Sequence, residues 1–127
     1  VIFSSWRPTL DIVHYALDSA RVGCVLVDGC VSPPNYKLAL EKLRYDPQAC
    51  VYLITISCGA VGLGLTTASR AYLLEPQWNP TTQEQALARV HRMGQTRTVR
   101  TVRFVVGGSF EDVCKARAHT AAGAHSK

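Results

Sequence analysis

The sequence predicts an α/β domain in which a mainly parallel β-sheet is covered by helices on both faces. Short β-rich runs alternate with segments of helical spacing in the order βαβαβ, loop, βαβα. Strands that each lead into a helix form parallel sheets with right-handed crossovers. The 127 residues are 47% hydrophobic and 18% charged, which suits one globular domain and excludes a disordered or fibrous chain.

Five apolar, β-rich runs are the expected strands: residues 1–5, 24–27, 50–56, 71–75 and 99–106. Pro8 fits the first turn of the first helix, and Ser32 caps the second. Ser109 caps the last helix. We expect the domain to span residues 1–114, with residues 115–127 as the end of the last helix and a frayed tail.

The third helix is expected to run from Thr81 to about Met93. Thr81 and Glu84 form a T-x-x-E capping box, and Gly94 is the stop signal. The outer face of this helix would carry three polar side chains at i, i+4 and i+7, namely Gln85, Arg89 and Arg92. A neighbouring face, expected to pack on the sheet, carries Ala86, Val90 and Met93.

Positive charge is concentrated near the end of the chain. The net charge is +5, and residues 89–127 hold eight basic and two acidic side chains. Between residues 89 and 103 there are five arginines and no acidic residue. This pattern suggests anion recognition, because guanidinium offers a rigid fork of donors to phosphate. Two arginines one helical turn apart repel unless an anion such as a triphosphate lies between them, and the alternative is a solvated face paired with carboxylates elsewhere.

Two loops that follow strands are further candidates, because ligands of parallel sheets bind at the carboxyl ends of the strands. Gly59, Gly62 and Gly64 would let backbone N–H groups approach a phosphate or a nucleic-acid backbone, but a tight structural turn explains them equally well. Trp78, between two prolines, could stack on a base or close an interface, or cover the domain's own core. For Trp6, core packing is the favoured alternative.

Several functional classes have no support in the sequence. The five cysteines form no CxxC pair and the four histidines show no metal-ligand spacing, so we expect no metal site, no disulfide framework and a reducing, intracellular compartment. The G-x-S-x-G signature of esterases is absent. No apolar run approaches the roughly 20 residues of a membrane span, and the first residues do not form a signal peptide.

The motifs resemble those of the second, C-terminal RecA-like lobe of Swi/Snf-type DNA translocases, the helicase-like ATPases of chromatin remodelling and DNA repair. VIFSSW (1–6) is similar to motif IV, and the VDG step at 27–29 with Ser32 is similar to the family's LDG…S. Residues 55–80 resemble motif V and the block after it, and residues 83–97 resemble motif VI. The EPQWNP and CGAVGL variants are similar to the repair-associated branch, in which RING fingers are often inserted.

The resemblance implies a RecA-like three-layer lobe and a role for each matching residue. Arg89 and Arg92 match the motif VI arginines that reach the nucleotide phosphates, and Arg92 matches the arginine finger. Gln85 and Gly62 would also face the nucleotide. The implied DNA-contacting residues are Ser5, Trp6, Gly59, Thr66 and Trp78. Gly64, Ala60 and Tyr36 stand where the family usually has Asn, Gly and Arg.

The resemblance also implies partners. The P-loop and the acidic box, which the family carries on its first lobe, are absent from these residues. ATP with Mg²⁺, the ion held mainly by that first lobe, would therefore be hydrolysed only when a first RecA-like lobe closes on this chain. The expected track is double-stranded DNA, with nucleosomes as a further candidate, in the nucleus. A non-catalytic DNA- or protein-binding module is the alternative, and a flavodoxin-like nucleotide binder is a third hypothesis.

Overall fold

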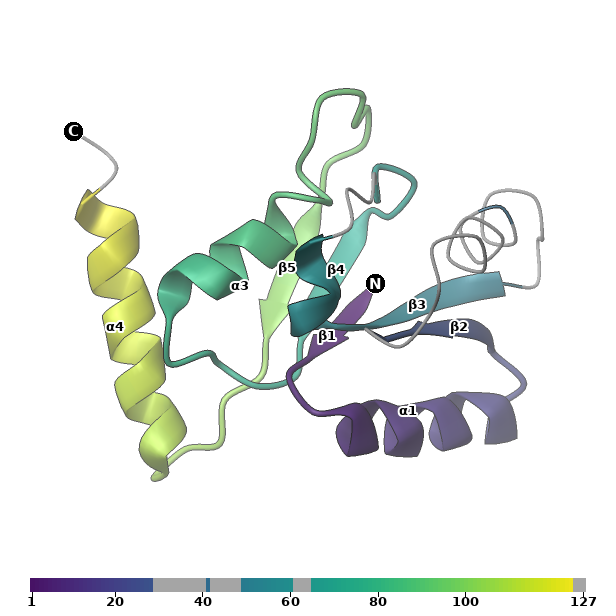
Figure 1. Ribbon diagram of the computed structural model, residues 1–127, viewed down its shortest axis with the longest axis horizontal. Helices are drawn as coiled ribbons and strands as arrows, with labels where there is room; N and C mark the ends of the chain where they lie inside the picture. The colour runs from purple at the N-terminus through teal and green to yellow at the C-terminus, as the bar shows by residue number, and fades with distance from the viewer. Residues whose placement is uncertain (29–40, 42–48, 61–64, 125–127) are drawn as a thin grey trace. The chain divides into compact units, whose positions relative to one another are not determined.

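The computed structural model describes residues 1–28, 41, 49–60 and 65–124, which fall into two compact units, residues 1–63 and 64–127. The first unit contains β1 (Ile2–Ser4), α1 (Arg7–Ser19), β2 (Gly23–Val27), β3 (Ala49–Thr55) and the short 3₁₀ helix η1 (Ile56–Ala60). The second unit contains β4 (Arg70–Leu73), α3 (Pro80–Leu87), β5 (Arg100–Arg103) and α4 (Phe110–Ala124) (Figure 1). All five predicted strands are confirmed, and the helix expected after Ser32 lies outside the described residues.

The first unit is a parallel sheet with one helix packed against it. Strand β3 lies between β2 and β1, with Leu53 beside Ile2 and Ile54 beside Val27. Helix α1 contacts all three strands and buries Leu10 completely. The buried apolar core of this unit comprises Val1, Phe3, Leu10, Val27, Tyr52, Leu53, Ile54, Ile56 and Cys58.

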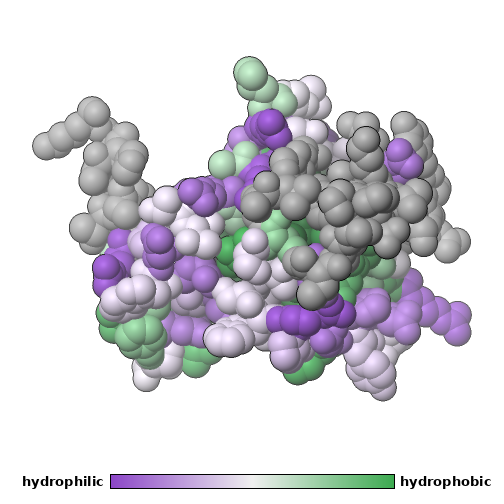
Figure 2. All heavy atoms as spheres, in the orientation of Figure 1, coloured by the Kyte–Doolittle hydropathy of each residue, from purple (hydrophilic) through white to green (hydrophobic). Residues whose placement is uncertain are grey.

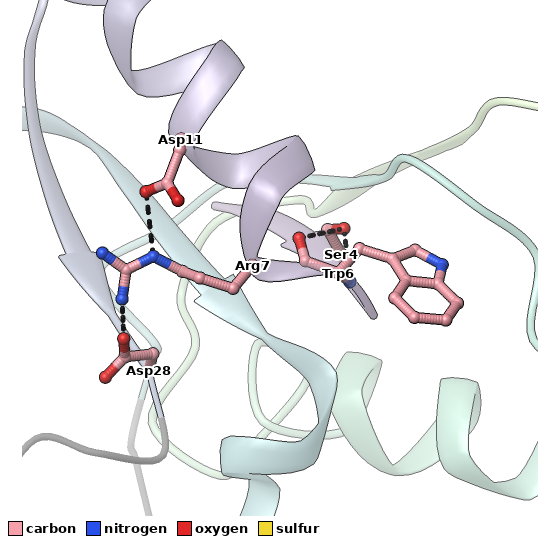
Figure 3. Close-up of polar contacts among 5 residues, drawn as sticks. All are labelled: Ser4, Trp6, Arg7, Asp11 and Asp28. Carbon is pink, nitrogen blue, oxygen red and sulfur yellow. Dashed lines mark hydrogen bonds and ion pairs between the residues drawn. The ribbon is translucent and has the colours of Figure 1, made fainter.

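A polar cluster fixes the start of α1. The Ser4 hydroxyl accepts the N–H of Trp6 at 3.0 Å. Arg7 donates from Nε to Asp11 at 2.9 Å, and its guanidinium pairs with Asp28 at the end of β2 (Figure 3). The indole of Trp6 points away from this ion-paired group and is 66% exposed. The expectation that Trp6 packs in the core is therefore wrong, because this residue is the N-cap of α1 and lies outside the sheet.

The second unit combines a parallel strand pair with two neighbouring helices. Strands β4 and β5 pair from Arg70 beside Arg100 to Leu73 beside Arg103. Helices α3 and α4 contact each other. The buried apolar residues of this unit are Leu65, Ala71, Leu73, Ala86, Leu87, Val90 and Cys114. Among the described residues, no helix is both long enough and apolar enough to cross a membrane.

Helix α3 begins at Pro80, with Asn79 as its N-cap, whereas the sequence predicted a start at Thr81. The side chain of Asn79 accepts the N–H of Thr81 at 3.0 Å, and Pro80 occupies the first helical turn. The predicted capping box of Thr81 and Glu84 is therefore wrong. Glu84 instead accepts a hydrogen bond from the guanidinium of Arg103 at 3.2 Å.

Helix α3 also ends earlier, at Leu87 rather than near Met93. The N–H groups of Arg89 and Val90 bond to carbonyls only three residues back, which tightens the chain into a turn. The Arg89 carbonyl then accepts the N–H of Leu65 at 3.2 Å, a partner outside the helix. Val90 is completely buried at the point where the chain leaves the helical path.

The next turn presents Arg92. The N–H of Gln95 donates to the Arg92 carbonyl at 3.0 Å, which closes a four-residue turn. Gly94, its third residue, has a φ of +96°, as a type II turn requires. Met93 is 98% exposed, so the prediction that it packs on the sheet is wrong, whereas Ala86 and Val90 are buried as predicted.

Replacing Asn79 by alanine tests the cap. We expect Asn79→Ala to lower the free energy of unfolding by about 1 kcal/mol, because the Thr81 N–H loses its acceptor. Thr81→Ala is the matched control and should change it by less than about 0.5 kcal/mol. Urea unfolding followed by circular dichroism measures both. A larger loss for Thr81→Ala than for Asn79→Ala would restore the capping box.

Gly94→Ala tests the turn that presents Arg92. A Cβ at Gly94 meets no atom within 4 Å, but the positive φ disfavours every L-residue side chain. We expect a loss of about 1–2 kcal/mol in the free energy of unfolding. Gly107, with equally open space and no positive φ, is the control, and Gly107→Ala should be neutral or stabilising by about 0.4–1 kcal/mol. Equal effects at both positions in urea unfolding would contradict the assigned turn.

Candidate functional site

The predicted arginine face is not a helix face. Gln85 is exposed on α3, Arg89 is half-buried in the turn after it, and Arg92 is exposed at the start of the following turn. The three residues therefore occupy three different local structures, because α3 ends before the arginines begin. Within the part of the chain that the structure describes, no carboxylate forms an ion pair with Arg92.

The loop that bears the arginines is tied to the loop after the glycine-rich segment. The side-chain amide of Gln95 donates to the Ala68 carbonyl at 2.8 Å and approaches the Val90 carbonyl at 3.4 Å. Its oxygen accepts the N–H of Arg97 at 2.9 Å. One side chain therefore satisfies backbone groups in both loops.

Two further bonds join the same loops. The guanidinium of Arg97 donates to the Thr67 carbonyl, and the N–H of Leu65 donates to the Arg89 carbonyl at 3.2 Å. We call these contacts between residues 65–68 and residues 89–97 the loop clamp. The clamp fixes the backbone on both sides of Arg92, so the exposed guanidinium extends from an ordered base.

Sequence reasoning assigned no role to Gln95 or Arg97. Both lie within the segment that resembles motif VI, but their partners are backbone carbonyls 27 and 30 residues away. Every residue has a backbone carbonyl, so the residue types at the acceptor positions, Ala68 and Thr67, do not reveal these hydrogen bonds. The one local signal of this arrangement in the sequence was Gly94, a residue type that favours a turn. In the structure its φ is positive, and the turn that contains it ends at Gln95.

Trp78 is engaged by helix α4. Its ring stacks on Phe110 with centroids 5.4 Å apart and an angle of 14° between the planes. The guanidinium carbon of Arg117 lies 4.0 Å from the Trp78 ring centroid. Trp78 remains 53% exposed, so it is neither a free stacking platform nor a lid buried on the core.

Apolar side chains continue this surface around the start of α4. Val106, Phe110 and Val113 are 62%, 64% and 49% exposed. Figure 2 shows apolar side chains at the surface near the beginning of this helix. The exposed Trp78 ring therefore belongs to a mixed surface in which a cation, Arg117, lies beside aromatic groups.

The other predicted site residues are spread over both units. Ser5 is half-buried in the bend after β1, and Gly59 lies in η1. Thr66 is half-buried in a turn that adjoins the loop clamp. Gly62 lies outside the described residues, as do Gly64 and Tyr36, whereas Ala60 ends η1.

The cysteines of the described segments are free thiols, and two of them, Cys58 and Cys114, are buried. The Thr55 hydroxyl donates to the Cys58 sulfur at 3.1 Å, which links the end of β3 to η1. Burial raises the pKa of the Cys24 thiol, and the charge of Asp18 raises it further. Such a thiol stays protonated and behaves as a small hydrophobe. Within the described residues, no group of three His, Cys, Asp or Glu side chains could hold a metal ion.

Comparison with known proteins connects these features to a family. Residues 1–94 match the family described as Helicase conserved C-terminal domain. The chain is 37% identical over 112 residues to the DNA repair protein RAD5A of Arabidopsis thaliana, which covers 88% of this chain and 11% of that protein. It is 32% identical over 111 residues to the ATP-dependent helicase rhp16 of Schizosaccharomyces pombe, covering 87% of this chain and 13% of that one.

A solved structure, the C-terminal part of the Fun30 ATPase domain, matches with a TM-score of 0.87 and 26% sequence identity. The match covers 92% of this chain and 38% of that chain, and it confirms the predicted RecA-like α/β fold. The chain spans only about a tenth of the length of the curated relatives named above. The relatives that it resembles include a DNA repair protein and an ATP-dependent helicase. On the match over residues 1–94, the chain belongs to the helicase conserved C-terminal domain family.

Proposed function

We propose that this chain is the second lobe of an ATP-dependent double-stranded-DNA translocase that acts in DNA repair in the nucleus. In this proposal, Arg92 and Arg89 complete an ATP site whose P-loop belongs to a first RecA-like lobe. The observation that supports it most is the exposed Arg92 guanidinium, presented on a turn whose backbone is held by the loop clamp. The similarity to an ATP-dependent helicase and to DNA repair proteins supports ATP use and the repair role.

The chemistry requires a cation of this kind. In the transition state of phosphoryl transfer, negative charge is spread over the equatorial oxygens of the γ-phosphate. An enzyme stabilises this charge with cationic groups that are already held next to those oxygens. A guanidinium contributes most when its backbone is already ordered, because little entropy is then lost when it meets the phosphate. The Mg²⁺ that accompanies ATP would be held mainly by the first lobe. The half-buried Arg89 is proposed to act on the phosphates together with Arg92, and the exposed Gln85 would hold the nucleotide.

The DNA-contacting role is proposed for Ser5, Trp6, Gly59, Thr66 and Trp78. Trp6 is exposed directly after β1, and Thr66 lies next to the loop clamp. Trp78 stands beside Arg117, so a phosphate near it would meet an aromatic face and a guanidinium together. Contacts of this type read the backbone of the duplex and carry little sequence information.

Arg92→Ala tests the proposed catalytic role. In the two-lobed protein that contains this chain, we expect DNA-stimulated ATP turnover to fall by about 10³-fold or more, because the transition state loses its charge partner. Binding of ATP should change far less, since the loss is confined to the transition state. Steady-state ATP hydrolysis with and without duplex DNA measures turnover, and equilibrium titration with a fluorescent ATP analogue measures binding.

The matched control is Arg21→Ala, which removes an exposed arginine at the end of α1. Arg21 has a φ of 56°, and alanine keeps the same Cβ, so the backbone strain is unchanged. Turnover should stay near that of the unmodified protein. Normal turnover by a folded Arg92→Ala protein would refute the finger role. If the unmodified two-lobed protein is folded but does not hydrolyse ATP, the alternative of a non-catalytic binding module is favoured.

The DNA contact is tested by salt. The two-lobed protein should bind two short duplexes of unrelated sequence with equal affinity, and both affinities should fall steeply as salt is raised. A site that neutralises six to ten phosphates loses about 10³- to 10⁵-fold between 50 and 200 mM salt. Fluorescence anisotropy gives the slope. A flat salt response, or a strong preference for one duplex, would contradict backbone recognition.

A further inference from the structure

The loop clamp places one side chain between two functional segments. Gln95 bonds through its side chain to Ala68 in the segment after the glycine-rich loop. Through its own N–H, it closes the turn that begins at Arg92. Each bond lies at or below 3.0 Å, so neither segment can shift without moving Gln95 or losing a bond.

We propose that Gln95 is a positioning residue that transmits the placement of residues 65–68 to the Arg92 guanidinium. This inference rests on the proposed function, since it assumes that Arg92 reaches the γ-phosphate. Residues 65–68 include Thr66, which is proposed to contact DNA. A duplex that engages this segment would therefore set the position of Arg92 through Gln95, and DNA binding would raise the rate of hydrolysis.

The geometry separates this role from simple support of the fold. Gln95 is only half-buried, whereas Val90 beside it is completely buried and provides the local packing. The Gln95 side chain meets three backbone groups, in Ala68, Val90 and Arg97. Its contribution is directional, because the amide must donate on one side and accept on the other.

The bond of Arg97 to the Thr67 carbonyl is a second arm of the same connection. It begins two residues after Gln95 and ends one residue before Ala68. Loss of one arm should weaken the transmission, and loss of both should remove it.

The isosteric variant Gln95→Glu tests the proposal. A carboxylate keeps the acceptor for the Arg97 N–H but cannot donate to the Ala68 carbonyl. The measured quantity is the ratio of ATP turnover with duplex DNA to turnover without it, in the two-lobed protein. We expect this ratio to fall about tenfold or more, since displacement of a catalytic group by about 1 Å can cost 10²-fold. The ratio does not depend on the folded fraction, so a purely structural defect leaves it unchanged.

Two controls accompany the variant. Thr96→Glu adds the same charge at the neighbouring exposed residue and should leave the ratio unchanged. Arg97→Ala removes the second arm and should lower the ratio by a smaller factor, with Gln95→Glu and Arg97→Ala together lowering it furthest. If Gln95→Glu does not fold, Arg97→Ala alone tests the proposal. An unchanged stimulation ratio in Arg97→Ala then overturns it.

The same series separates this proposal from the one on which it rests. Normal turnover in Arg92→Ala would remove the proposed catalytic role, whatever Gln95 does. Loss of turnover in Arg92→Ala, together with an unchanged stimulation ratio in Gln95→Glu, would overturn the positioning role alone. A fall in the ratio caused equally by Thr96→Glu would also overturn it, because charge and not the lost donor would then be the cause.

Discussion

The hydrogen bonds that join residues 65–68 to residues 89–97 are the constraint on which the candidate site depends. Both segments are irregular, and several of their backbone groups are paired outside helices and strand ladders. The Gln95 amide, the Arg97 guanidinium and the Leu65 N–H meet those groups. The two loops therefore order each other, and the exposed Arg92 obtains a fixed base without being part of a helix.

The early end of α3 makes this arrangement possible. If the helix had continued to Met93, the carbonyl of Arg89 would have accepted the N–H of Met93. Because the helix ends at Leu87, the Arg89 carbonyl accepts the N–H of Leu65 instead, and the Val90 carbonyl faces the Gln95 amide. Arg92 is consequently coupled to the loop that follows the glycine-rich segment and not rigidly to α3. In the proposed translocase, such a connection would let Arg92 respond to DNA, because an arginine on a helix would move only with that helix.

The strands were predictable because each lies in a short β-rich run closed by turn residues, and the parallel order follows from the helices between them. The ends of α3 were not. Two local cap signals competed at its start, and Asn79 with Pro80 prevailed over Thr81 with Glu84, whose carboxylate pairs with Arg103. The role of the arginines, inferred from residue type and resemblance, stays a prediction, whereas their expected placement on one helix face is wrong. The loop clamp could not be predicted from the sequence, because its acceptors are backbone carbonyls that lie far from Gln95 and Arg97 along the chain.

The energetics of the Trp78 surface bear on how DNA could reach it. The ring is stacked on Phe110 and lies close to Arg117, so a DNA contact would compete with α4 for the same side chain. A cation–π contact at an exposed site is worth only about 0.5–1 kcal/mol. A charge-assisted bond from the same guanidinium to a phosphate is worth about 1.5–3 kcal/mol. Arg117 therefore loses little by turning from Trp78 to a phosphate, and the stack with Phe110 can hold the ring in place while it does so.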